Sequence, residues 1–182
     1  MRMLVDRSRD GTDLPFDLDS VKLHLRVVGT EEDAAITNIG HAACAEIEHF
    51  AQIALLTQTI TVTIVRPVLE GCLRLPIGPL IDVTSVAIRI DGTAFDAFSV
   101  VGGIRPLVHW ETHLAPPAPA EMVVIYEAGF GTDTADIPPD LAQALMDQAA
   151  LHYDGRSPMD AKSLTTSPHM ARIGARYRGV QV

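Results

Sequence analysis

Apolar residues recur every three or four positions between residues 31 and 54, which is the spacing of one face of an α-helix. The repeating positions are Ile36, Ile39, Ala43, Ile47, Phe50 and Ala54. Thr30 is a candidate N-cap, and three acidic residues follow it in the first turn, where the helix dipole favours negative charge. The pattern therefore predicts a long helix over about residues 31–54.

Two further helices are predicted, one before this segment and one near the other end of the chain. The first begins with Asp17 as N-cap and ends by Gly29. The other follows Pro138 and Pro139 and runs to about Tyr153, since proline is well placed in a first helical turn. We expect residues 17–56 to pack with the C-terminal helix, residues 138–155, as one helical part.

The hydrophobic period changes from helix to strand after residue 57. Gln58–Arg66 alternates β-branched apolar residues with threonines, and Glu121–Glu127 is a second clear strand. Asp91-Gly92 is a strong hairpin turn signal. Further strands are predicted at Cys72–Leu75, Val83–Ile90, 94–101 and 104–110. The chain is therefore predicted to have an α+β fold, with an antiparallel β unit of about six or seven strands, residues 57–137, inserted between the helices.

The two ends of the chain lack a strong period. Residues 1–16 alternate between basic and acidic groups, which is typical of a flexible or draped N-terminal arm. Residues 156–182 are expected to form an extended basic tail. The two cysteines, Cys44 and Cys72, are isolated and are expected to be reduced.

Composition indicates a folded protein with apolar surface to spare. Hydrophobic residues make up 47% of the 182 residues, aromatic residues only 5%, and the mean hydropathy is +0.19. No apolar run approaches the roughly 18 residues that span a bilayer, and the N-terminus lacks an apolar signal core, so neither a membrane partner nor secretion is expected. Oligomers bury such spare surface between subunits, although a merely alanine-rich sequence has the same composition.

Charge divides the chain into an acidic body and a basic tail. Residues 1–155 hold 9 basic and 22 acidic residues, a net charge of −13, whereas residues 156–182 hold 5 basic and 1 acidic residue, a net charge of +4. An acidic body is unsuited to wrapping nucleic acid, because proteins that bind DNA present basic faces. The tail is suited to docking on an acidic partner, or it is a solvated, frayed end.

The sequence gives only weak evidence for catalytic or metal-binding groups. His41, Cys44 and Glu48 could share one face of the long helix, but His49 points elsewhere and no second ligand cluster follows. His109, Glu111 and His113 alternate, as on one face of a strand, but this pattern in a proline-flanked region has little specificity for a metal. Gly129-Phe130-Gly131 follows a strand, but its spacing matches neither dinucleotide nor phosphate loops, and a strand-end turn is favoured. No catalytic residues, metal or cofactor are therefore predicted, and the chain is not expected to be an enzyme.

Six short motifs, in order over residues 17–155, give the chain a specific resemblance. They are Leu18–Val27 (LDSVKLHLRV), Ile47–Phe50 (IEHF), Leu56–Thr59 (LTQT), Leu75–Val86 (LPIGPLIDVTSV), Val124–Gly131 (VIYEAGFG) and Ile137–Leu141 (IPPDL). Together they resemble the head–tail connector, or adaptor, proteins of long-tailed phages and of the phage-like gene transfer agents. Residues 51–56 lack the Thr-Gly-Arg that is usual in that family, and residues after 156 are not covered.

The resemblance implies a structural protein that joins the portal of a DNA-filled head to the tail. The expected assembly is a ring, usually of twelve copies, which contacts the portal on one side and a tail-side stopper or terminator protein on the other. DNA would pass through this channel without sequence-specific binding, and an acidic lumen would help its passage. The protein would be found at the head–tail junction of the virion or particle, assembled in the bacterial cytoplasm.

The basic tail is the candidate portal-binding segment, and it would dock on the portal in an extended or helical form. The residues assigned to this contact are Arg172, Ile173, Arg176, Tyr177, Arg178 and Val180, with Ile173 and Val180 as apolar anchors. Truncation at about residue 156 is expected to leave the body folded and to abolish portal attachment.

Two other functional classes stay open from the sequence alone. A tail-completion or stopper protein of the same particle has a similar small β-rich body, but it generally lacks the N-terminal helix pair. A small binding or hydrolase domain with an unrecognised site is the other class, and turnover of a small substrate by a monomer would identify it.

Overall fold

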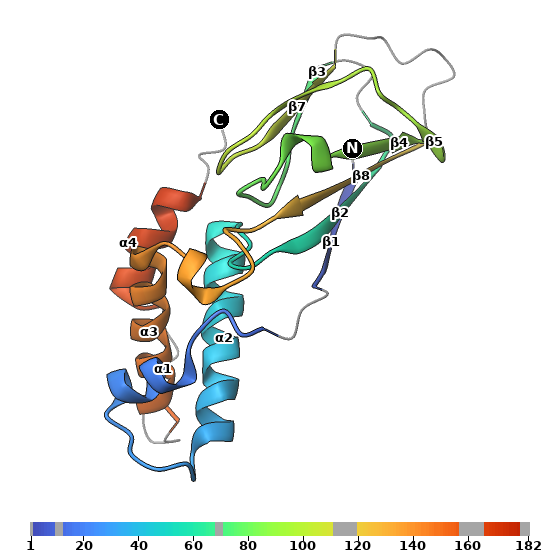
Figure 1. The fold of residues 1–182 in the computed structure, drawn as a ribbon. Helices are drawn as coiled ribbons and strands as arrows, with labels where there is room; N and C mark the ends of the chain where they lie inside the picture. The colour runs from blue at the N-terminus through green and yellow to red at the C-terminus, as the bar shows by residue number, and fades with distance from the viewer. Residues whose placement is uncertain (1, 10–12, 68–70, 111–119, 157–165, 179–182) are drawn as a thin grey trace. The chain divides into compact units, whose positions relative to one another are not determined.

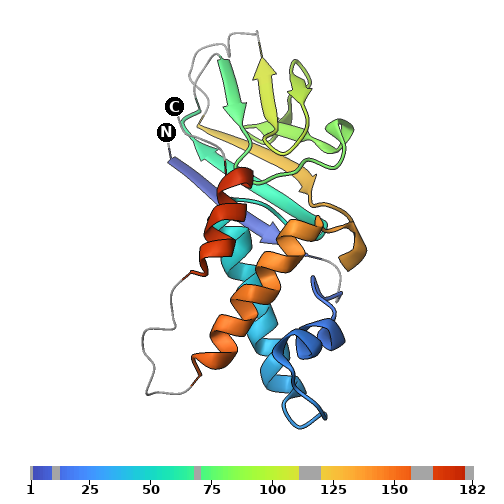
Figure 2. The same ribbon diagram turned by 90° about the vertical axis from the view of Figure 1, so that its left-hand side faces the viewer.

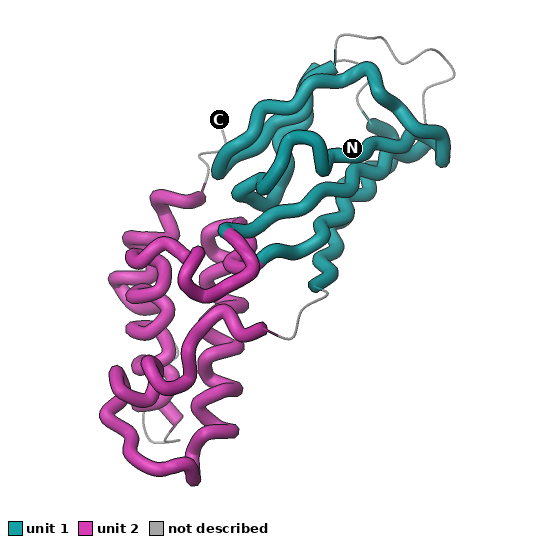
Figure 3. The backbone as a smooth tube through the Cα atoms, viewed as in Figure 1, with its two compact units in different colours: residues 1–11, 57–130 teal, residues 12–56, 131–182 magenta. Residues whose placement is uncertain are grey.

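A computed structural model of the chain describes residues 2–9, 13–67, 71–110, 120–156 and 166–178, and these form four α-helices and eight β-strands (Figure 1). The chain divides into two compact units, each built from two stretches of sequence (Figure 3). Residues 1–11 and 57–130 form the β unit, and residues 12–56 and 131–182 form the helical unit. The predicted α+β fold, with an antiparallel β unit inserted between packed helices, is confirmed.

The β unit contains two antiparallel sheets. The five-stranded sheet has the order β1-β2-β8-β4-β5, with bounds Arg2–Ser8, Gln58–Val65, Glu121–Ala128, Ala87–Ile90 and Thr93–Ala94. The three-stranded sheet has the order β3-β7-β6, with bounds Gly71–Arg74, Leu107–Trp110 and Ser99–Val101. Alternate residues of the two central strands, β2 and β8, form the core of the unit. These residues are Ile60, Val62, Ile64, Met122, Val124, Tyr126 and Ala128, each at most 1% exposed.

Tyr126 joins the core to the loop before η1 (Val83–Ser85), a short 3-10 helix. Its hydroxyl donates to the Ile77 carbonyl at 3.0 Å and accepts from the Ile77 N–H at 3.1 Å. The Tyr126 side chain is fully buried, so both backbone groups of Ile77 depend on this one hydroxyl for a partner away from water.

Replacement of Tyr126 by phenylalanine is therefore expected to lower the free energy of unfolding by about 1–3 kcal/mol, because it leaves buried backbone groups unsatisfied. Chemical denaturation measures this loss. Tyr177→Phe is the matched control: that tyrosine is half-buried, and its variant is expected to lose less. An unchanged midpoint for Tyr126→Phe would contradict the buried hydrogen bonds.

The prediction of a flexible or draped N-terminal arm over residues 1–16 is wrong for residues 2–8, and residues 1 and 10–12 lie outside the described residues. Residues 2–8 form β1, which pairs antiparallel with β2 from Arg2↔Val65 to Ser8↔Thr59. Phe16 is only 6% exposed, and a Cβ placed on Gly40 would lie 2.5 Å from its ring. The charged residues of this segment hide its alternation of apolar and polar positions, and an edge strand tolerates such residues because solvent surrounds it on several sides.

The predicted strand over Val83–Ile90 also differs at its start. Its first residues form η1, because the Asp82 carboxylate accepts from the Thr84 N–H at 2.9 Å and caps the turn. Strand β4 begins only at Ala87. The hydrophobic alternation was correct, but the aspartate capping signal was missed.

The helical unit is formed by α1 (Leu18–Leu25), α2 (Asp33–Ala51), α3 (Pro139–Asp154) and α4 (Pro168–Tyr177). Figure 2 shows α2, α3 and α4 side by side, and α1 contacts both α2 and α3. Asp17 caps α1 as predicted, accepting from the Ser20 N–H at 2.9 Å. The long helix starts later than predicted, with Glu32 instead of Thr30 at the N-cap position. Within the described residues, no helix combines the length and apolar character needed to cross a membrane.

Candidate functional site

Helix α4 lies in the segment predicted to be an extended basic tail, and residues 168–177 are helical instead of extended. Ser167 is its N-cap, accepting from the Met170 N–H at 3.0 Å, and Pro168 occupies the first turn. Met170, Ile173, Gly174 and Tyr177 follow with spacings of three, one and three, which place them on one helical face. The signal was present in the sequence, but it is short.

The inner face of α4 is part of the core of the helical unit. Met170 and Ile173 are each only 2% exposed. Gly174 allows a close approach to the end of α2, since a Cβ at this position would lie 2.5 Å from the Phe50 ring. Any larger side chain at Gly174 must displace that ring. Helix α4 therefore packs on α2 and α3 as a built part of the unit.

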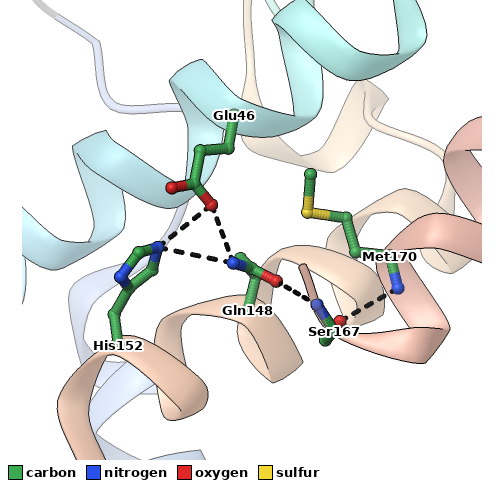
Figure 4. A network of polar contacts seen from close by, with 5 residues as sticks. All are labelled: Glu46, Gln148, His152, Ser167 and Met170. Carbon is green, nitrogen blue, oxygen red and sulfur yellow. Dashed lines mark hydrogen bonds and ion pairs between the residues drawn. The ribbon is translucent and has the colours of Figure 1, made fainter. Parts of the chain in front are cut away.

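A polar network ties the start of α4 to both neighbouring helices (Figure 4). The Ser167 N–H donates to Gln148 Oε1 at 2.8 Å, and Gln148 Nε2 donates to Glu46 Oε2 at 2.7 Å. His152 Nε2 lies 3.0 Å from the same Glu46 oxygen. Gln148 is only 1% exposed, and these contacts give both ends of its buried amide a hydrogen-bond partner.

Two aspartates of α3 hold the rest of α4. His169 Nδ1 lies 2.6 Å from Asp147 Oδ2, and the Tyr177 hydroxyl donates to Asp140 Oδ1 at 2.9 Å. The Arg176 guanidinium lies 3.8 Å from Asp140 Oδ2. These contacts are at the two ends of the helix, so both ends of α4 are fastened to α3.

The structure separates the predicted portal-binding residues into two groups. Arg172, Arg176 and Arg178 are exposed, and they give the outer face of α4 and its C-cap a positive charge. Ile173 points into the core, so its predicted role as an apolar anchor on a partner is wrong in this conformation. Tyr177 is half-buried against Asp140, and Val180 lies outside the described residues.

All three tyrosines of the chain are held in their neutral form. Burial raises the pKa of Tyr126 above its usual value, and burial with the Asp140 hydrogen bond raises the pKa of Tyr177 to about 12. The pKa of Tyr153 is raised by the hydrogen bond that its hydroxyl donates to the Glu32 carboxylate at 2.5 Å. Glu32 is also paired with Arg156 at 3.1 Å, which joins the start of α2 to the end of α3.

A spectrophotometric titration is therefore expected to show no tyrosinate forming near pH 10, the usual tyrosine pKa, while the protein is folded. Because the unfolded chain ionises near pH 10, the neutral tyrosines stabilise the fold below that pH, and the contribution of Tyr177 is lost as the pH rises toward 12. The same titration in urea is the control. Ionisation of all three tyrosines near pH 10 in the folded protein would contradict these contacts.

Several of the side chains considered for metal binding are buried or have other contacts. Within the described residues, no group of three or more histidine, cysteine, aspartate or glutamate side chains could hold a metal ion. Cys44 is buried, and the Glu48 carboxylate accepts from the Leu55 N–H at 2.8 Å. The His41 ring packs edge-on against Phe16. His109 is exposed on β7, and Glu111 and His113 lie outside the described residues.

The Gly129–Gly131 segment is a strand-end turn, as favoured from the sequence. Gly129 has a φ of 150°, which disfavours other residues, and its N–H donates to the Pro79 carbonyl at 2.9 Å. The backbone donor is therefore used inside the β unit.

Solved structures similar to this chain come from one kind of particle. The virion of a native gene transfer agent particle contains a chain that is 26% identical, with a TM-score of 0.78 over 98% of this chain and 97% of that chain. The neck of a native particle with C12 symmetry contains one that is 27% identical, with a TM-score of 0.75 over 100% and 97%. The neck of an empty particle with C6 symmetry contains one that is 23% identical, with a TM-score of 0.78.

No protein-family model matches the sequence, and no curated protein is similar to it. The similarity to particle necks extends over nearly the whole chain, α4 included, so it covers the segment that the six motifs did not. The resemblance to head–tail connectors of phage-like particles is thereby confirmed.

Proposed function

We propose that this protein is a structural head–tail adaptor in the neck of a gene transfer agent or a related phage-like particle. The observation that carries the proposal is the whole-chain similarity to chains of gene transfer agent virions and necks. The shared fold extends over 97% of those chains. The role is one of assembly and not of catalysis.

The symmetry of the similar necks supports a ring of copies. Both C6 and C12 occur among them, and a ring of twelve copies satisfies both symmetries. In this ring, one side meets the portal and the other meets a stopper or terminator protein of the tail. DNA passes through the centre, where the net charge of −13 on residues 1–155 discourages binding to phosphates. The assembled ring is located at the head–tail junction, after assembly in the bacterial cytoplasm.

The exposed face of α4 is the part of the chain best suited to grip the portal. Arg172, Arg176 and Arg178 present positive charge on a helix that is itself firmly held by its inner face. A rigid helix carrying three long cationic side chains loses less entropy on binding than a free tail would. The portal contact is therefore assigned to these three arginines rather than to Ile173.

Deletion of the gene in the producing strain tests the proposal. We expect particles without the protein to package DNA into heads that lack attached tails, and expression in trans to restore complete particles. Electron microscopy of purified particles gives the readout. Normal tailed particles from the deletion strain would overturn the proposed function.

A further inference from the structure

The β unit exposes apolar side chains at two places. One lies at the β1 edge of its five-stranded sheet, and the other lies on the far side of strands β2 and β8. The first, named the β1 patch, comprises Met3, Leu4, Val5 and Val65, each between 40% and 56% exposed. The second, named the β6 patch, comprises Ile81, Val83, Val101 and Ile104, each between 43% and 59% exposed. Solvated monomers rarely gather several such side chains, so patches of this kind mark contact surfaces.

The β1 patch follows from the position of β1 at the edge of the sheet. Met3 and Val5 stand opposite Ile64 and Val62, so they continue the buried apolar rows of β2, yet they are far more exposed than their partners. Leu4 stands opposite Thr63 on the other face. Among the described residues, no strand pairs with the outer side of β1, so these apolar side chains lie at an edge of the sheet.

The β6 patch gathers around the outer strand of the smaller sheet. Val101 ends β6, and Val83 lies beside the next residue, since a Cβ on Gly102 would come within 3.2 Å of its side chain. Ile104 and Ile81 flank a hydrogen bond from the Leu80 N–H to the Gly103 carbonyl at 3.0 Å. All four side chains therefore belong to one local cluster in the β unit.

The two patches lie on either side of strands β2 and β8 in the lateral order of the strands. Ala128, at the end of β8, pairs with Gln58 of β2 on one side and with Leu80 on the other. The β1 patch lies beyond β2, and the β6 patch is attached on the Leu80 side. Strands are about 4.8 Å apart, so at least two strands separate the patches by roughly 10–15 Å. In a head-to-tail ring, each copy contacts its two neighbours through two different surfaces, which must lie on different sides of the unit.

The charges beside the two patches are complementary. Arg2, next to Met3 and opposite Val65, is exposed at the end of β1, in a body that is otherwise strongly acidic. The β6 patch is accompanied by the exposed carboxylates of Asp82, between Ile81 and Val83, and of Glu127, whose carbonyl accepts from the Ile81 N–H at 3.2 Å. Opposite charges at the rims of two apolar patches favour their association and set its direction.

We propose that the β1 patch of one copy docks on the β6 patch of the next copy, so that the β unit carries both halves of the ring interface. The occupant of each patch is a second copy of this chain, and the contact is heterologous. The inference rests on the proposed function, because the repeated contact closes only in a symmetric assembly such as the C12 neck.

Paired cysteines in assembled particles test this contact. Leu4→Cys and Val101→Cys are made together and singly in a Cys72→Ser background, which removes the exposed native thiol and keeps the buried Cys44. Both positions are more than half exposed, so the substitutions leave the core intact. Purified particles are treated with a short bismaleimide, and the chain is followed on a denaturing gel. We expect the double variant to form a ladder of covalent multimers and each single variant to stay monomeric.

The other outcomes are equally informative. A ladder absent from the double variant, with the chain detected in the particles by mass spectrometry, would overturn the interface and leave the proposed function intact. Dimers from Leu4→Cys alone would show a two-fold contact and overturn the head-to-tail arrangement. Equal multimers from a Leu4→Cys/Val28→Cys control, whose second site is exposed on the helical unit, would also overturn it. Absence of the chain from particles would contradict the proposed function and the inference with it.

Discussion

Deletion of residues 167–182 is expected to destabilise the helical unit by about 3–6 kcal/mol, because it exposes the surfaces that cover Met170 and Ile173, at roughly 1.5–3 kcal/mol for each buried side chain. The deletion also removes the backbone donor of Ser167 that satisfies buried Gln148. We therefore no longer expect truncation at about residue 156 to leave the body fully folded, since Met170 and Ile173 of α4 are buried in the helical unit.

Hydrogen exchange of α2 and α3 measures this effect within the helical unit. The control deletes only residues 179–182, which leaves α4 complete and is expected to keep the protection of both helices. The two deletions also divide the predicted portal-binding residues, because the control removes Val180 alone among them. Equal protection of α2 and α3 in the two deletions would contradict the packing of α4.

Reversal of two charges on α4, by Arg172→Glu and Arg176→Glu together, is expected to weaken attachment to the portal by at least about tenfold while the protein stays folded. Both side chains are exposed, and the only contact described for them is the long ion pair of Arg176 with Asp140 at 3.8 Å. Exposed charges contribute little to stability, so a loss of attachment would come from the interface itself.

Co-sedimentation of the variant with portal-bearing heads measures this attachment. Arg172→Lys/Arg176→Lys is the conservative variant and is expected to retain most binding, since it keeps the charge. Arg89→Glu, at an exposed position on β4, is the matched control for a reversed charge elsewhere. Full attachment of the double glutamate variant would exclude the outer face of α4 as the portal contact.

The elements with long, regular patterns were predictable from the sequence. The 3-4-4-3-4 spacing of apolar residues indicated α2, and the alternation of Gln58–Arg66 indicated β2, because one buried face dictates each period. The pairing of helices across an inserted β unit followed from their flanking positions. In α2 and β2, the residue types alone distinguish the buried face from the exposed face.

The elements missed were those whose pattern is short or whose surroundings decide the outcome. Strand β1 has apolar residues on both faces and charges at both ends, so its alternation is masked until β2 is placed beside it. Helix α4 has one buried stripe of only a few residues, and its stability depends on Phe50 and Gln148, which are distant in sequence. Assignment of Ile173 to the partner failed for the same reason, because a single apolar residue does not reveal which protein buries it.

Cryo-electron microscopy of the purified particle, at a resolution that shows side chains, tests the central claim most directly. The account predicts a ring of this chain between portal and tail, with the arginines of α4 facing the portal and the β1 and β6 patches buried between neighbouring copies. Density at the head–tail junction that this chain does not fit, in particles whose tails are attached, would contradict it.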